Sequence, residues 1–200
     1  MNDLQAKEEI QLIKEMIEKT KHTAADYWKL FFCWGLVGIL GVTVMYMLVL
    51  FEKYEWIWIN WIGFIGIGVI YTVLFVIRTE KKQRIKTYTY TSISHLSFAC
   101  GISFLLCGFA FPLSGLYEYG LIPVLISVVA GIYAFALGGI IEWNLLKVCG
   151  VIWWLGSAGM IFIDPDYRAI LFVPLLILGY LIPGFIFRSG IRKPKAANES

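Results

Sequence analysis

The feature that most limits how this chain can fold is a pair of long stretches without any charged residue, residues 96–117 and 119–141. Each is long enough to cross the roughly 30 Å of hydrocarbon in a bilayer, which takes about 20 residues of α-helix. In hydrocarbon, a single segment can pair all of its backbone N–H and C=O groups only as a helix. Only 16% of the residues are charged, whereas a soluble domain has about 25%. The sequence therefore predicts an all-α integral membrane protein.

Apolar segments of this kind occur six times, so we expect a polytopic transmembrane helical bundle over residues 30–187. A cytoplasmic amphipathic helix and the approach to the membrane would precede the bundle (1–29), and a basic cytoplasmic tail would follow it (188–200). The fourth and fifth spans are expected to separate at 142–144, because one helix over both would be about twice the hydrocarbon thickness. The predicted spans are 30–51, 57–77, 92–111, 121–141, 146–163 and 169–187.

The lysines and arginines predict the orientation of this bundle. Of the 17 basic residues, 15 lie on one side of the predicted membrane, and only Lys53 and Arg168 lie on the other. Because basic residues near span ends are retained in the cytoplasm, both termini are expected to be cytoplasmic. Aromatic side chains favour the headgroup region, and a group of them at the predicted outer ends agrees with this orientation. They are Tyr54, Trp56, Trp58, Trp61, Tyr117, Tyr119 and Tyr167.

The N-terminal segment is polar but carries apolar residues at helical spacing. Ile10, Ile13, Met16 and Ile17 form a narrow stripe, which predicts a cytoplasmic amphipathic helix. Up to the first span, six acidic residues balance five lysines, which argues against a polybasic lipid anchor. A short isolated helix is marginal in water. We therefore expect it to dock on the basic loop 78–86, on a second protomer or on a separate cytoplasmic protein.

Glycines recur within three of the predicted spans. A glycine lets two helix backbones approach closely and gain dispersion contacts, so these residues predict tight packing inside the bundle or between protomers. The alternative is a glycine-lined pore or hinge, which spacing alone does not separate from packing. The glycines concerned are Gly35, Gly38 and Gly41 in the first span, Gly63, Gly66 and Gly68 in the second, and Gly156 and Gly159 in the fifth.

Two prolines predict an irregular sixth span. Pro174 lies in its first half, and Pro183 with Gly184 lies near its inner end. Each proline removes one helical hydrogen bond and clashes with the preceding turn, so we expect a kinked or interrupted helix. Such helices line the sites of some transporters and are packing features in other proteins.

Charged residues are missing from the centres of all six predicted spans. Intramembrane charges are the usual sign of ion or proton pathways, so their absence disfavours transport coupled to protons or sodium and leaves a passive pore open. Hydroxyl side chains can bond to their own helix backbone instead. The polar residues nearer the centres are Thr43, Tyr46, Thr72, Ser103, Ser127, Tyr133 and Ser157.

No catalytic, cofactor-binding or metal-binding residue is predicted. His22 and His95 are isolated from any pattern of metal ligands, and the acidic pair in 164–166 flanks a proline, as is typical of a turn. The cysteines form neither a zinc motif nor a disulfide framework, and the nearest pair is about 10 Å apart along a helix, too far to bridge. The four cysteines are Cys33, Cys100, Cys107 and Cys149.

Four short motifs are spread over most of the chain. They are Met16-Ile17-Glu18, Tyr27 with Trp34-Gly35, Arg84-Ile85-Lys86-Thr87-Tyr88, and Gly179-Tyr180-Leu181-Ile182-Pro183-Gly184. Together they resemble a group of bacterial multi-span membrane proteins of unknown function. The resemblance implies the bacterial inner membrane and supplies no activity.

The leading hypothesis is a non-enzymatic integral membrane protein that acts through protein–protein contacts, as an assembly, regulatory or sensory component. The alternative is a small oligomeric pore or passive transporter, and a membrane-embedded enzyme ranks third because catalytic motifs are missing. Expected partners are the lipid bilayer, a second copy through the glycine-rich helix faces, and a cytoplasmic protein at the N-terminal helix. The net charge of +3 reflects membrane orientation, and no nucleic acid is expected to bind.

Overall fold

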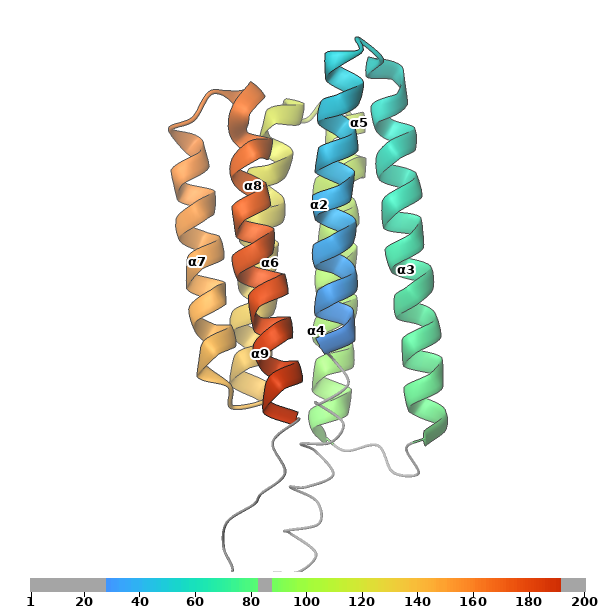
Figure 1. The fold of residues 1–200 in the computed structure, drawn as a ribbon, viewed down its shortest axis with the longest axis vertical. Coiled ribbons are helices and arrows are strands. Elements are labelled where there is room, and N and C mark those ends of the chain that lie inside the picture. The colour runs from blue at the N-terminus through green and yellow to red at the C-terminus, as the bar shows by residue number, and fades with distance from the viewer. Residues whose placement is uncertain (1–27, 83–87, 192–200) are drawn as a thin grey trace, which may run out of the picture.

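The computed structural model describes residues 28–82 and 88–191, and every regular element in these ranges is a helix (Figure 1). The predicted N-terminal amphipathic helix and the tail beyond residue 191 lie outside the described residues. Six helices are long and apolar enough to cross a membrane, which confirms the predicted number of spans. They are Trp28–Leu50, Tyr54–Arg78, Tyr88–Leu113, Tyr119–Ile140, Asn144–Ile161 and Pro165–Ile186.

Several spans contain more than one helical element. The elements are α2 (Trp28–Leu50), η1 (Tyr54–Trp56), α3 (Ile57–Lys82), α4 (Tyr88–Leu105), η2 (Leu106–Ala110), α5 (Phe111–Leu113), η3 (Tyr119–Leu121), α6 (Ile122–Ile140), α7 (Asn144–Ile161), η4 (Pro165–Tyr167), α8 (Arg168–Leu176), η5 (Ile177–Leu181) and α9 (Ile182–Ile191). The break between α6 and α7 lies where the sequence predicts it. The third span begins at Tyr88, four residues before the predicted start at 92.

Three spans end in the same kind of turn, with one residue in the left-handed backbone conformation. That residue is Glu52 (φ 58°) after α2, Gly115 (φ 74°) after α5 and Glu142 (φ 55°) after α6. In each case the following amide donates to the carbonyl five residues earlier, as Trp143 does to Gly138 at 2.8 Å. This 6→1 bond is the mark of a Schellman cap, in which glycine is the usual left-handed residue. Two of the three turns use glutamate instead.

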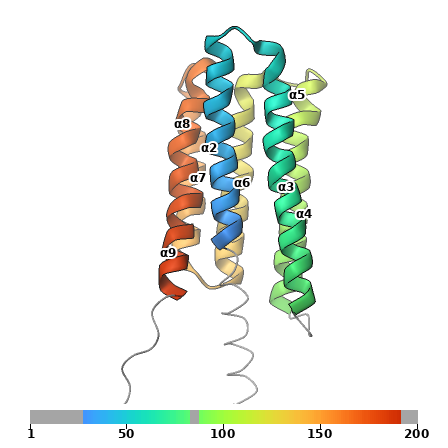
Figure 2. The ribbon, with the colours of Figure 1, turned by 45° about the vertical axis from the view of Figure 1, so that its right-hand side comes forward.

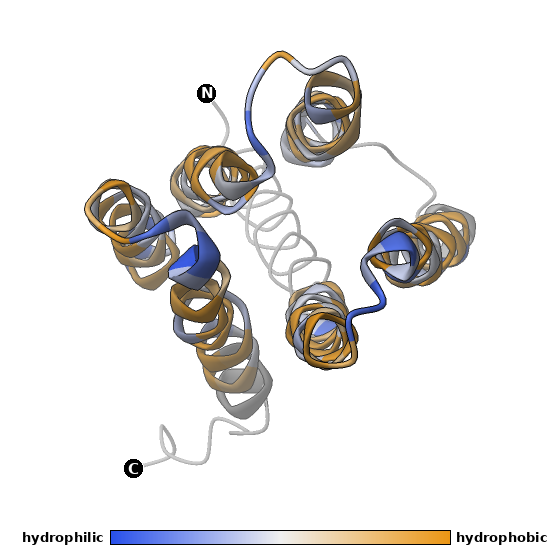
Figure 3. Ribbon diagram, turned by 90° about the horizontal axis from the view of Figure 1, so that it is seen from above, coloured by the Kyte–Doolittle hydropathy of each residue, from blue (hydrophilic) through white to orange (hydrophobic). Residues whose placement is uncertain are grey.

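The spans stand side by side with their connections at two ends (Figure 1). We call the end that carries residues 51–56, 114–118 and 162–167 the loop end, at the top of Figure 1. Seen from that end, the hydrophilic residues gather in the connections and the helices are predominantly hydrophobic (Figure 3). This distribution is the one that a bilayer requires.

The six spans are not equally packed. In each of the fourth, fifth and sixth spans, 33% of the most apolar 18-residue stretch is buried, whereas the share is 6% in the second span and 11% in the third. We call α6, α7 and the α8–η5–α9 span the packed side, and α3 and the α4–η2–α5 span the open side. In Figure 2, α2 stands between α8 and α3, and it packs against both.

The core of the bundle lies on the packed side. Leu146, Trp153 and Met160, which follow one face of α7, are at most 1% exposed. They belong to a cluster with Phe172 and Leu175 of the sixth span and with apolar residues of α6. The large exposed hydrophobic side chains lie on the outer surface of the bundle, where a bilayer would cover them.

Candidate functional site

The glycines of the first span pack inside the bundle. A Cβ atom built on Gly38 would lie 2.8 Å from the side chain of Leu176, and one on Gly35 would lie 2.9 Å from that of Leu181. Both neighbours belong to the sixth span. Gly41 contacts α3 instead, because its Cβ would meet the Trp61 ring of that helix at 3.0 Å. Of the two packing modes that the sequence leaves open, these three glycines take the one within the protomer.

Two tryptophan rings, each packed against a glycine of the other helix, join α2 to α3. The ring of Trp34 lies against Gly68, where a Cβ would be 3.1 Å away, just as Trp61 lies against Gly41. Trp34 also donates its Nε1–H to Thr72 Oγ1 at 3.1 Å, and Thr72 donates in turn to the Gly68 carbonyl at 2.8 Å. A polar link inside hydrocarbon is therefore fully paired.

Asn60 adds a second polar link between the same two helices. Its Nδ2 donates to the Gly41 carbonyl at 3.0 Å. Its buried Oδ1 has no hydrogen-bond partner among the described residues. The amide therefore stabilises α2 against α3 through one of its two polar ends.

The closest helix pair, α6 with α7, depends on glycines that the sequence analysis did not single out. A Cβ on Gly150 would lie 2.8 Å from the backbone nitrogen of Phe135, and one on Gly138 would lie 2.8 Å from that of Lys147. A Cβ on Gly131 would lie 2.3 Å from Trp154 Nε1. Gly131 and Gly138 are seven residues apart, two turns on one face of a helix. This spacing is the signal that could have identified the pair.

Most hydroxyl groups that the sequence places near the span centres are hydrogen-bonded to their own helix or to a neighbouring one. Ser127 donates to the Pro123 carbonyl of its own helix at 2.7 Å, and Thr43 and Ser103 also bond within their helices. Ser157 instead crosses from α7 to the Val124 carbonyl of α6 at 3.0 Å. Tyr133 Oη lies 3.3 Å from Ser97 Oγ of α4. These polar groups link helices or satisfy their own backbone.

Two spans are interrupted by a π-helical turn, and both interruptions have the same sequence pattern. Leu106–Ala110 is η2 and Ile177–Leu181 is η5, and each has glycine in the middle followed by an aromatic residue. Each is followed two residues later by proline, Pro112 in LCGFAFP and Pro183 in ILGYLIP. The predicted interruption of the sixth span is confirmed, whereas the interruption of the third span, which Pro112 follows, is not among the sequence predictions.

The prolines explain why each π turn leaves a carbonyl without a backbone donor. In η2 the amide of Phe111 donates to the carbonyl of Leu106, five residues earlier. The next bond in this register would join residue 112 to Cys107, but proline has no N–H. In η5 the same geometry leaves the carbonyl of Leu178 without its donor, because residue 183 is Pro183. An unpaired carbonyl in hydrocarbon is costly.

Side chains supply both missing donors. The hydroxyl of Tyr117 donates to the Cys107 carbonyl. Burial raises the pKa of this phenol, with a smaller contribution from Cys107, so it remains a protonated donor at neutral pH. The thiol of Cys149 in α7 donates to the Leu178 carbonyl at 3.6 Å. The two π turns are thus completed in equivalent ways by unrelated residues.

The surroundings of the two π turns differ. A Cβ on Gly179, in the middle of η5, would lie 2.0 Å from Trp153 Nε1, and Trp153 also packs on Tyr180 with ring centroids 5.6 Å apart. A Cβ on Gly108, in the middle of η2, would meet only Ile126 at 3.7 Å, an ordinary contact. The turn on the packed side is therefore tightly enclosed, and the one on the open side is not.

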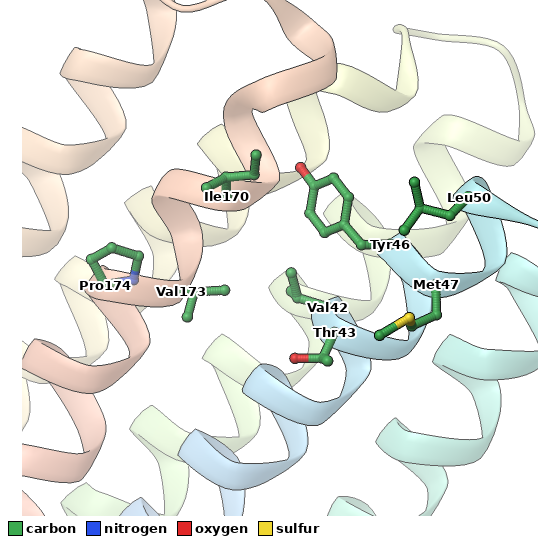
Figure 4. Close-up of a pocket in the computed structure, with 8 residues that line it drawn as sticks. All are labelled: Val42, Thr43, Tyr46, Met47, Leu50, Ile170, Val173 and Pro174. Atoms are coloured by element: carbon green, nitrogen blue, oxygen red, sulfur yellow. The ribbon is translucent and has the colours of Figure 1, made fainter.

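A shallow groove of about 390 Å³ lies between α2 and α8 (Figure 4). Tyr46 reaches from α2 towards Ile170, and its hydroxyl donates to the Asp166 carbonyl at 3.2 Å. The other hydroxyl at the groove, that of Thr43, is bonded to the Ile39 carbonyl. The remaining lining is apolar, so the groove offers hydrocarbon contacts alone.

Within residues 28–82 and 88–191, the histidine, cysteine and acidic side chains do not form a cluster. Among the described residues, no group of three or more His, Cys, Asp or Glu side chains could hold a metal ion. His95 lies in α4, and His22 is outside the described residues. The four cysteines are free thiols. Asp164 and Asp166 flank Pro165 at the start of η4, the turn that the sequence predicts.

No family model, no curated protein and no solved structure matches the chain.

Proposed function

We propose that this chain is a non-enzymatic multi-pass protein of the bacterial inner membrane that acts through protein–protein contacts, as an assembly, regulatory or sensory component. The observation that carries the proposal is the uncovered face of α3. In this account the packed side is a scaffold, and the open side meets a second copy of the chain.

The uncovered face of α3 lies opposite its contact with α2. Trp61 and Gly68 mark the contact with α2. Gly63 and Gly66 are each two residues from one of them, about 200° around a helix. A Cβ on either glycine would meet nothing within 4 Å. Ile70, also two residues from Gly68, is 62% exposed.

Glycine on such a face favours a helix neighbour over lipid. A second helix can approach a glycine face closely enough to gain dispersion contacts along its backbone. Lipid tails are as apolar as leucine, so hydrophobicity alone does not drive this association. Close approach at Gly63 and Gly66 is therefore the feature that would select a protein partner.

The mass of the purified particle tests this proposal. We expect the wild-type chain to form an oligomer and the double variant Gly63→Leu/Gly66→Leu to form a single-chain particle with unchanged thermal unfolding, because the added side chains meet nothing within the bundle. Gly159→Leu on α7 is the matched control, since a Cβ there also has no neighbour within 4 Å. A single-chain mass for the wild type, or an unchanged oligomer in the double variant, would contradict the proposal.

We further propose that both termini are cytoplasmic, on the strength of the uneven distribution of lysine and arginine. In a cysteine-free background, Tyr117→Cys and Pro165→Cys should react with an impermeant thiol reagent added to whole cells, and Lys82→Cys should not. Labelling of Lys82→Cys with protection of Tyr117→Cys would reverse the orientation.

The N-terminal helix is proposed as the cytoplasmic contact of the protein. Its apolar stripe should contribute more to docking than its charges, because exposed ion pairs are worth only about 0 to 1 kcal/mol. Replacing Ile10, Ile13 and Ile17 with Ser should leave the bundle inserted and folded while changing partner recovery or particle mass. Unchanged assembly would show that the segment is dispensable.

A passive pore or transporter is the second candidate, and the paired π turns favour it. The third and sixth spans close the first and second halves of the six-span chain, and each is interrupted by a π turn, near the C-terminal end of the third span and near the middle of the sixth. Interrupted spans at corresponding positions of two halves mark the substrate sites of many transporters. Flux of ions or small neutral solutes through reconstituted liposomes, above that of protein-free vesicles, would favour this candidate over the first.

A further inference from the structure

The π turn of the third span competes with an α register of the same residues. In the π register, Pro112 leaves the Cys107 carbonyl without a backbone donor. In an α register the same proline would leave the Gly108 carbonyl without one instead. The π register also leaves one more carbonyl unpaired where it returns to the α register, because Ser114 donates to Ala110 and only the Leu113 amide remains for the Gly108 and Phe109 carbonyls. The π register therefore needs a donor from elsewhere in the chain.

Tyr117 is that donor, and it lies on a connection rather than in the core. Its hydroxyl bonds the Cys107 carbonyl, and its ring lies 6.4 Å from that of Phe111. The flanking residues of the connection are exposed, with Leu116 at 68%. One hydrogen bond from a connection at the surface therefore pairs a carbonyl that the π register of η2 leaves without a backbone donor.

The segment held in this way also contacts the second span at the loop end. Trp58 of α3 packs on Phe109 of η2, with ring centroids 5.8 Å apart, and on Tyr119 of η3, at 5.6 Å. A change from π to α register would turn Phe109 around the helix axis. The contact between the second and third spans at this end therefore depends on the register of η2.

We propose that Tyr117 and the Cys107 carbonyl form a latch, which holds residues 106–113 in the π register and keeps Trp58 packed on Phe109. Release of the latch lets this segment change register and separates the second and third spans at the loop end. The sixth span has no such freedom, because Trp153 and Cys149 enclose η5 from the core. The proposed change of hydrogen-bond register is thus confined to the third span, on the open side.

Hydrogen exchange of the full chain in detergent tests the latch. Tyr117→Phe keeps the ring and removes the donor, and amides in residues 106–113 should then exchange about tenfold faster, as expected for the loss of one buried hydrogen bond. Tyr119→Phe is the control, because Tyr119 keeps its ring contact with Trp58 and no hydrogen bond of its hydroxyl is found among the described residues. Amides in residues 177–183 should exchange at the wild-type rate in both variants.

Pro112→Ala makes the test specific to the latch. It restores an N–H that can bond the Cys107 or the Gly108 carbonyl, so adding Tyr117→Phe to Pro112→Ala should change exchange by less than about twofold. If Tyr117→Phe accelerates hydrogen exchange equally in the wild type and in Pro112→Ala, the latch is overturned. The tyrosine hydroxyl would then act independently of the backbone N–H that is missing at Pro112. Unchanged exchange in Tyr117→Phe alone, or faster exchange throughout the bundle, would also overturn the latch.

Discussion

Neighbouring helices are held together by different contacts on the packed side and on the open side of this bundle. On the packed side, α6 and α7 approach so closely that a Cβ atom on Gly138 or Gly150 would lie 2.8 Å from a backbone nitrogen of the neighbouring helix. On the open side, α3 is attached to α2 by tryptophans on glycines and by two polar links. Burial is therefore concentrated in one part of the molecule, and the other part leaves more of its surface exposed.

Gly150→Leu should have the largest effect on stability. Its Cβ would lie 2.8 Å from the Phe135 nitrogen and 2.9 Å from the Gly131 carbonyl oxygen, and backbone atoms cannot move aside as a side chain can. Overpacking of this kind costs about 3 kcal/mol or more. Thermal unfolding in detergent measures it, with Gly159→Leu on the same helix as the control. Equal melting temperatures for the two variants would show that the α6–α7 contact tolerates a large side chain. The packed side would then not be held by close packing at glycine.

Gly38→Leu should destabilise the bundle less. Its added side chain would meet the end of the flexible Leu176 side chain, which can shift at a cost of about 1 to 2 kcal/mol. The same unfolding measurement ranks it between Gly150→Leu and Gly159→Leu. A loss as large as that of Gly150→Leu would mean that α2 belongs to the packed side.

Ser157→Ala should cost about 1 kcal/mol, because hydrogen bonds between helices in membranes contribute about 0.6 kcal/mol on average and up to about 1.7 kcal/mol. Ser157 links α7 to the Val124 carbonyl of α6. Ser103→Ala is the control, since Ser103 bonds only within its own helix, to Ala99. If both variants unfold alike, the bond between helices adds nothing measurable to the packed side.

The sequence predicts the number of spans better than it predicts the contacts between them. Long apolar stretches suffice to predict six helices, because hydrocarbon leaves the backbone no other choice. The glycines of the first span stand at a recognisable spacing of three. The contact between α6 and α7 instead depends on glycines seven residues apart on one helix and on Gly150 of the other, a pairing that one sequence does not reveal.

The π turns show where prediction from local pattern ends. Proline indicates that a helix is irregular, but the form of the irregularity depends on where the orphaned carbonyl finds a donor. That donor is ten residues away in the chain for Cys107 and twenty-nine for Leu178. The turns at Glu52 and Glu142 are similar cases, because glutamate is not the residue that signals a left-handed backbone.

Cysteine cross-linking in native membranes tests most directly whether the open side is the contact surface. In a background without native cysteines, Gly63→Cys and Ile70→Cys on α3 should form a disulfide-linked dimer on mild oxidation, since bridging requires Cα atoms within about 7 Å. Leu155→Cys on α7, where the native side chain is 67% exposed, should stay monomeric. A dimer at Leu155→Cys with none at the α3 positions, or no dimer at any of the three, would contradict the account.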